Sequence, residues 1–134
     1  MKRASLLLIV LTVFCHAAAA EPVIEYGKLE ELSSIDRYFV DAGEDLDLRN
    51  IIREVIEKNL QVHVVDRPED ADHIIVFRYS DAGDVWQCQA VVAKTLSPGR
   101  VRILANYRGR EADRDDLAGD FARWFVKKLR ELPK

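Results

Sequence analysis

Two amphipathic segments with helical spacing constrain the fold of this chain more than any other feature of its sequence. In residues 46–59, apolar side chains recur every three or four positions while charged side chains occupy the opposite face, which predicts a helix. Residues 114–131 show the same pattern, with aspartates near the start and basic residues near the end, as the helix dipole favours. Each predicted helix must bury its one apolar stripe against another layer. The stripes consist of Leu48, Ile51, Ile52, Val55, Ile56 and Leu60 in the first helix and of Leu117, Phe121, Trp124, Phe125, Leu129 and Leu132 in the second.

Short segments rich in β-branched and aromatic residues predict strands around these helices. Polar or glycine-containing turns separate most of them, and the turn from Ser97 to Arg100 has Pro98 and Gly99 at the central positions of a type II turn. The predicted strands are residues 35–40, 61–66, 74–79, 85–95 and 101–107. Residues 21–34 are weakly patterned, and a strand at 23–26 is left open.

The order of these elements predicts an α+β fold, a two-layer α/β sandwich with a mixed sheet of about five strands. The order is β-α-β-β-β-β-α, within a single domain that covers residues 35–132. A strand–helix–strand unit implies a right-handed crossover and a parallel pair. The remaining strands are joined by short turns and should form an antiparallel meander. We expect both helices to pack on one face of the sheet and the other face to be wet.

The first twenty residues have the features of a secretory signal peptide. Lys2 and Arg3 precede an apolar run at residues 6–14, and the alanines at 17–20 place cleavage before Glu21. The apolar run is too short to span a membrane, which takes about 20 residues. A lipoprotein signal is disfavoured because Phe14, rather than a small residue, precedes Cys15. We therefore predict an exported protein, periplasmic or secreted, with no transmembrane span in the mature chain.

Charge and cysteine content narrow the function of the mature domain. Removing the two basic residues of the signal changes the formal net charge from −3 to −5, which argues against nucleic-acid binding. Cys88 is then the only thiol, so an internal disulfide is excluded. It shares a strand face with Trp86, Ala90 and Val92, which predicts a buried core thiol. Pairing between chains or reactivity is the alternative for an odd cysteine.

The segment from Asp45 to Asp72 resembles a group of small exported bacterial envelope domains. A helix at 48–58 leads into Val62-His-Val-Val-Asp-Arg67, and Glu69-Asp-Ala-Asp72 then precedes an apolar strand. The group includes the N-terminal domain of TolB-like periplasmic proteins and the periplasmic domain of curli-secretion lipoproteins. The shared positions specify a fold more than a function. The resemblance implies an envelope protein that acts by contact, with no catalytic residues to carry over.

The polar residues predict neither a catalytic nor a metal site. His63, His73 and Cys88 lack the close spacing of zinc ligands, although adjacent strands could bring the histidines together. Two groups of acids lack the spacing of a calcium loop or a cleft for acid–base chemistry, and helix capping accounts for them. These groups are Asp41, Glu44, Asp45 and Asp47, and Asp113, Asp115, Asp116 and Asp120. We predict a protein that is not an enzyme and holds no cofactor.

Basic residues on the last predicted strand form the one candidate binding site. Arg100, Arg102, Arg108 and Arg110 share parity, so they should project from the wet face opposite a core-facing set. That core-facing set is Val101, Ile103, Ala105 and Tyr107. A solvated face balanced by acids on neighbouring strands also explains the arginines.

Two functions are compatible with this surface. The leading hypothesis is a non-catalytic interaction domain that binds an envelope protein through the wet face or through an open strand edge. The alternative is a small-ligand or anionic-lipid-binding module that uses the arginines. The oligomeric state is left open.

Overall fold

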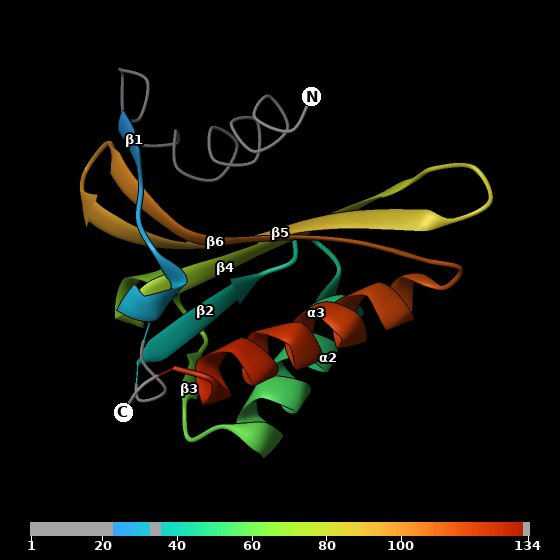
Figure 1. The fold of residues 1–134 in the computed structure, drawn as a ribbon, viewed down its shortest axis with the longest axis horizontal. Coiled ribbons are helices and arrows are strands. Elements are labelled where there is room, and N and C mark those ends of the chain that lie inside the picture. Colours follow the sequence, from blue (N-terminus) through green and yellow to red (C-terminus); the bar gives the residue numbers. More distant parts are fainter. Residues whose placement is uncertain (1–22, 33–35, 133–134) are drawn as a thin grey trace.

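A six-stranded mixed sheet carries two helices on one of its faces (Figure 1). The computed structural model describes residues 23–32 and 36–132, so the predicted signal peptide, residues 1–20, lies outside the described residues. The elements are β1 (Val23–Tyr26), the 3-10 helix η1 (Leu29–Glu31), β2 (Arg37–Asp41), α2 (Leu46–Asn59), β3 (His63–Val65), the 3-10 helix η2 (Pro68–Asp70), β4 (His73–Asp81), β5 (Trp86–Ser97), β6 (Arg100–Glu111) and α3 (Arg114–Arg130).

The strand order is β1-β6-β5-β4-β2-β3. As predicted, β2 and β3 flank α2 in sequence and pair in parallel, and β4, β5 and β6 form an antiparallel meander. Two features were not predicted. The sheet has a sixth strand, because β1 pairs in parallel with β6 from within the segment read as weakly patterned. The strand β4 pairs in parallel with β2 rather than with β3, which leaves β3 at an edge.

Both helices begin at the aspartates that the sequence offers as caps. The side chain of Asp45 accepts a hydrogen bond from the backbone N–H of Leu48, at 3.1 Å, and so satisfies one of the amides that an α-helix leaves unpaired at its start. Asp113 does the same for the N–H of Asp115 at the start of α3, at 2.8 Å. Neither helix in the described part of the chain is long and apolar enough to cross a membrane.

The two helices lie side by side and run in the same direction (Figure 1). Arg114 at the start of α3 lies 3.8 Å from a carboxylate oxygen of Asp45 at the start of α2. At the other end, Arg130 donates a hydrogen bond to the backbone carbonyl of Asn59, at 3.0 Å. Parallel helices bring like ends of two dipoles together. Acids in both first turns and bases in both last turns offset that repulsion.

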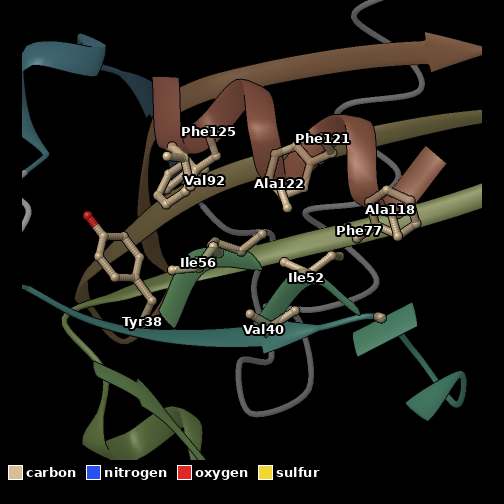
Figure 2. Packing of buried hydrophobic residues seen from close by; sticks show 14 of the residues in the cluster. Tyr38, Val40, Ile52, Ile56, Phe77, Val92, Ala118, Phe121, Ala122 and Phe125 are labelled. Atoms are coloured by element: carbon tan, nitrogen blue, oxygen red, sulfur yellow. The ribbon is translucent and has the colours of Figure 1, made fainter. Parts of the chain in front are cut away.

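The main core lies between the helices and the sheet face that they cover, called here the helix face (Figure 2). Phe121 of α3 is at its centre, with its ring 6.0 Å from that of Phe77 on β4 and 5.5 Å from that of Tyr107 on β6. The ring of Phe125 meets that of Tyr38 edge to face at 5.4 Å. Aromatic pairs at these separations add to the free energy gained from burial alone.

We expected the opposite face of the sheet, called here the far face, to be wet, but part of it is buried and apolar. Val76 on β4 alternates with residues of the main core, so it points to the far face, yet it is fully buried. Val91, Ala93, Val101 and Ile103 form a second buried cluster, against which Ile24 of β1 packs. The half of the far face nearest β1 is therefore apolar, and its side chains are buried.

The position of Phe121 at the centre of the main core predicts a large loss of stability when its ring is removed. We expect Phe121→Ala to lower the free energy of unfolding by about 3–5 kcal/mol, because it removes the ring and leaves a cavity that the neighbours fill only in part. Urea unfolding followed by circular dichroism measures the change. The control is Leu46→Ala, at a side chain that is 63% exposed, which should change stability by no more than about 0.5 kcal/mol. Equal losses in the two variants would contradict this description of the core.

Candidate functional site

The predicted arginine stripe is split by an irregularity in β6. The pairing of β5 with β6 shifts between Val92, which pairs with Ala105, and Ala93, which pairs with Ile103. Leu104 is thus an extra residue in β6, and its side chain lies in the main core together with Ala105. A β-bulge of this kind reverses the faces to which residues before and after it point. The shared parity assumed from the sequence ends at this position.

The consequence is two separate pairs of arginines. Arg100 and Arg102 alternate with Val101 and Ile103, which face the far side, so these two arginines project on the helix face. Arg108 and Arg110 come after the bulge and alternate with Tyr107, which packs on the main core, so they project on the far face. The prediction from the sequence is therefore wrong. It placed all four arginines on one face and Val101, Ile103, Ala105 and Tyr107 on the other.

The sequence contains a sign of this bulge. The alternation of polar and apolar residues in β6 breaks at Ile103, Leu104 and Ala105, which are three apolar residues in succession. A strand that keeps one phase would expose the middle residue of such a run on the polar face. Leu104 is 5% exposed, because the extra residue turns it toward the main core.

The first pair of arginines belongs to an ion cluster formed by Glu25, Glu31, Arg100 and Arg102, called here the N-terminal ion cluster. Arg102 donates from Nε to Glu31 at 2.8 Å and from Nη1 to Glu25 at 3.1 Å. Arg100 lies 3.5 Å from Glu25. The hydrogen bond from Arg102 is the main reason that the pKa of Glu31 falls from 4.5 to about 2. These ion pairs attach β1 and η1 to β6. Because two acids balance two bases, the cluster has little net charge with which to bind an anion.

The second pair of arginines lies at the polar end of the far face. Gln89 on β5 pairs with Arg108 in the sheet register, and its side chain donates a hydrogen bond to Asn106 at 3.1 Å. On the same face, Arg78 of β4 lies 3.2 Å from a carboxylate oxygen of Asp41. The polar end of the far face is thus occupied by internal hydrogen bonds and ion pairs.

The two histidines are not brought together. Strand β2 separates them, because Arg37 pairs with His63 whereas the next residue, Tyr38, pairs with His73. His63 is exposed, whereas His73 is 4% exposed and its Nε2 lies 2.8 Å from a carboxylate oxygen of Asp36. Within residues 23–32 and 36–132, no three histidine, cysteine or acidic side chains are grouped as metal ligands.

Cys88 lies where the sequence predicts it, in the main core with Ala90 and Val92. Burial raises the pKa of its thiol from 9.0 to about 11. A thiol with a raised pKa is largely protonated near neutral pH and is therefore a poor nucleophile. This environment is that of a structural cysteine.

The acidic residues act mainly at helix starts. Asp45 also accepts a hydrogen bond from the hydroxyl of Tyr79, at 3.0 Å, and Arg114 donates to the same hydroxyl, at 3.2 Å. These three side chains join β4 to the starts of both helices and line an open hollow there. The hydrogen bond from the N–H of Leu48 is the largest cause that lowers the pKa of Asp45.

One acidic pair was not foreseen. A hydrogen bond joins the side chains of Asp120 on α3 and Glu111 at the end of β6, and it raises the pKa of Glu111 while it lowers that of Asp120. Glu111 therefore holds a proton more readily than an isolated glutamate, and Asp120 holds one less readily than an isolated aspartate. Asp120 also accepts a hydrogen bond from Arg123. The two acids lie on different elements, at the end of β6 and inside α3, so no local sequence pattern indicates the contact.

The two edges of the sheet differ in how they are protected. Strand β3 has only three residues. Where it ends beside β2, Arg49 of α2 donates to the carbonyls of Val40 and Val65, at 3.1 and 3.5 Å, and Arg53 binds the adjacent Asp66 at 2.9 Å. Short strands and charged side chains are common protection for an edge. Strand β1 has four residues, and its one charged side chain, Glu25, is bound in the N-terminal ion cluster.

Strand β1 is an edge of the sheet, and no strand within residues 23–32 and 36–132 pairs with its outer side. Val23 donates its N–H to the carbonyl of Gly99, just before β6, at 2.6 Å, and Gly27 donates to that of Ile103 on β6, at 2.8 Å, so the alternating backbone groups of Ile24 and Tyr26 point away from β6. Val23 is 60% exposed and Tyr26 is 62% exposed. Leu96, which is 38% exposed, lies near the same corner at the turn between β5 and β6. We call the outer side of β1 the open edge.

Comparisons with known proteins place this chain by fold. No protein-family model matches it, and none of the curated proteins matches it by sequence. Its fold is similar to that of a PelC dodecamer chain from Paraburkholderia phytofirmans, with a TM-score of 0.52 and 11% sequence identity, over 82% of this chain and 95% of that one. An uncharacterized lipoprotein B from Nitrosomonas europaea matches over 76% and 77% of the two chains at 17% identity. Its TM-score of 0.33 is too low to argue from.

These comparisons define the class of the molecule, a small two-layer α/β domain with the fold of the PelC chain. At 11% identity they establish the fold alone.

The N-terminal ion cluster predicts how acid affects stability. Because the pKa of Glu31 is about 2 in the folded protein and 4.5 ordinarily, its stabilising effect is complete above pH 4.5 and is lost as the pH falls from there through 2. We expect Glu31→Gln to be less stable than the unmodified protein at pH 7. The difference in the free energy of unfolding should shrink as the pH falls below 4.5 and approach zero below the folded pKa of about 2. Urea unfolding across this pH range measures it.

Glu30→Gln is the matched control, because Glu30 is the exposed neighbour of Glu31 in η1. It should leave the pH dependence of stability unchanged. A Glu31→Gln difference that stayed constant across the pH range would show that the ionised carboxylate does not hold η1 against β6.

Proposed function

We propose that this chain is a non-catalytic protein-binding domain of the bacterial envelope, which binds a partner through the open edge. The observation that carries the proposal is the difference between the two edges of the sheet. Strand β3 has three residues and ends beside Arg49 and Arg53 of α2, whereas β1 has four residues, outward backbone groups that no described strand pairs with, and the exposed side chains of Val23 and Tyr26. Strand edges with exposed backbone groups are common sites at which one chain adds a strand to another.

A non-catalytic role is supported by how the polar groups are used. The imidazole of His73 is buried against Asp36, and the thiol of Cys88 is buried with a raised pKa. Activated groups for catalysis need access to a substrate as well as a shifted pKa. The acids at the helix starts cap backbone amides or bind arginines.

An envelope location is supported by the sequence, and action through contacts between chains is supported by the fold. The export signal at residues 1–20 and the resemblance to small exported domains both predict passage across the inner membrane. The PelC chain of similar fold occurs as a dodecamer. A domain of this fold can therefore act through contacts between chains, and we propose that this chain does so too.

The alternative function, binding of a small ligand or of anionic lipid, loses its geometric basis. It required Arg100, Arg102, Arg108 and Arg110 on one face, and the bulge at Leu104 divides them between two faces. Electrostatic attraction to a lipid surface requires several basic residues within reach of the same plane.

Site-specific photocrosslinking in the bacterium that exports the protein tests the proposal. A photoreactive amino acid at position 26 should give protein adducts, because Tyr26 lies at the open edge. The matched control is position 46, since Leu46 is 63% exposed and Tyr26 is 62% exposed, but Leu46 lies at the start of α2.

Adducts at position 26 that exceed those at position 46 support binding at the open edge. Equal adducts at the two positions would contradict the proposal, because exposure alone would then account for them. The absence of adducts at position 26 would contradict it as well, because no partner would then contact the open edge.

A further inference from the structure

We infer that the partner at the open edge is a second copy of this chain, which pairs its own β1 antiparallel to the first across a two-fold axis. This inference rests on the proposed function and names the partner. The two sheets would join into one continuous sheet. Such a self-complementary contact is the usual form of a two-fold dimer, in which each copy offers the same surface.

The register follows from which backbone groups point outward. Ile24 and Tyr26 of one copy offer N–H and C=O groups to the partner. In an antiparallel pair, opposed residues with outward groups exchange two hydrogen bonds. Opposing Ile24 to the partner's Tyr26 satisfies all of these groups and places Glu25 on the two-fold axis. One residue of slip in either direction leaves outward groups unpaired.

The side chains are compatible with this register. Ile24 and Tyr26 share one face of β1, so an aliphatic and an aromatic side chain lie opposite each other twice, a pairing that stabilises antiparallel strands. Ile24 packs on the second cluster with Val101 and Ile103. The dimer would thus join the second clusters of the two copies through these pairs and cover Tyr26, one of the most exposed large apolar side chains of the described residues.

Charge does not oppose the contact. Two Glu25 side chains approach at the axis, and like charges directly opposite each other would normally destabilise a strand pair. Here each Glu25 already lies 3.1 Å from Arg102 and 3.5 Å from Arg100 of its own copy. The N-terminal ion cluster has two acids and two bases, so the paired edges are close to neutral.

The size of the contact sets its strength. A strand of four residues buries less surface than the standard interface of about 800 Å² per partner. We therefore expect a weak dimer that forms with rising protein concentration, rather than a permanent one.

Sedimentation of the exported protein over a range of concentrations tests self-association. The unmodified protein should shift from monomer to dimer as its concentration rises. Tyr26→Lys should raise the dissociation constant by about tenfold or more, because a charge on an edge strand opposes pairing. Leu46→Lys, at a side chain of matched exposure, should leave the constant unchanged.

Disulfide crosslinking tests the register. Glu25→Cys places two thiols on the two-fold axis, where opposed Cα atoms about 4.5 Å apart permit a disulfide. Val23→Cys is the control, since each copy's residue lies two positions from the axis and the two Cα atoms are about 13 Å apart. Oxidation should give a covalent dimer with the first variant and little with the second. The native Cys88 is buried in both variants.

The outcomes separate this inference from the function on which it rests. A protein that stays monomeric at every concentration, with equal crosslinking of the two cysteine variants, overturns the second-copy inference. If photocrosslinking at position 26 then yields an adduct with another protein, the open edge still binds a partner. If it yields none, both proposals fail.

Discussion

The bulge at Leu104 is the feature on which the arrangement of this protein depends. One extra residue in β6 exchanges the two faces of the strand partway along its length. Before the bulge, Val101 and Ile103 point to the far face and form a second cluster, and Arg102 is free to reach β1 and η1 on the helix face. After it, Tyr107 points to the main core and packs against Phe121. A strand of constant phase could build only one of these contacts.

The sequence predicts those parts of the fold that depend on short-range periodicity. The ranges of both helices, the parallel pair formed by β2 and β3 and the burial of Cys88 follow from the 3.6-residue and two-residue repeats and from Asp45 and Asp113 at the helix starts. The misplaced features depend on contacts between residues far apart in sequence. Examples are the pairing of β1 with β6 across more than seventy residues and the choice of β2 over β3 as the neighbour of β4.

The candidate site shows the same difference between features that depend on local periodicity and features that depend on long-range contacts. Four arginines at even positions indicate a stripe only if the strand keeps one phase, and Ile103, Leu104 and Ala105 were the local sign that it does not. Glu31 and Glu25 neutralise two of the arginines from segments that no local pattern links to β6. The open edge itself could not be identified before the strand order was known, because the sequence does not show which strands lie at the edges of the sheet.

The N-terminal ion cluster holds one side of β1 against β6, and we propose that the other side of β1 pairs with a second copy of the chain. The most direct test is residue-resolved amide hydrogen exchange at low and high protein concentration. Pairing predicts that the amides of Ile24 and Tyr26 become protected as concentration rises, while the amides of the β3 edge exchange at a constant rate. Exchange at Ile24 and Tyr26 that does not depend on concentration would contradict self-pairing at the open edge.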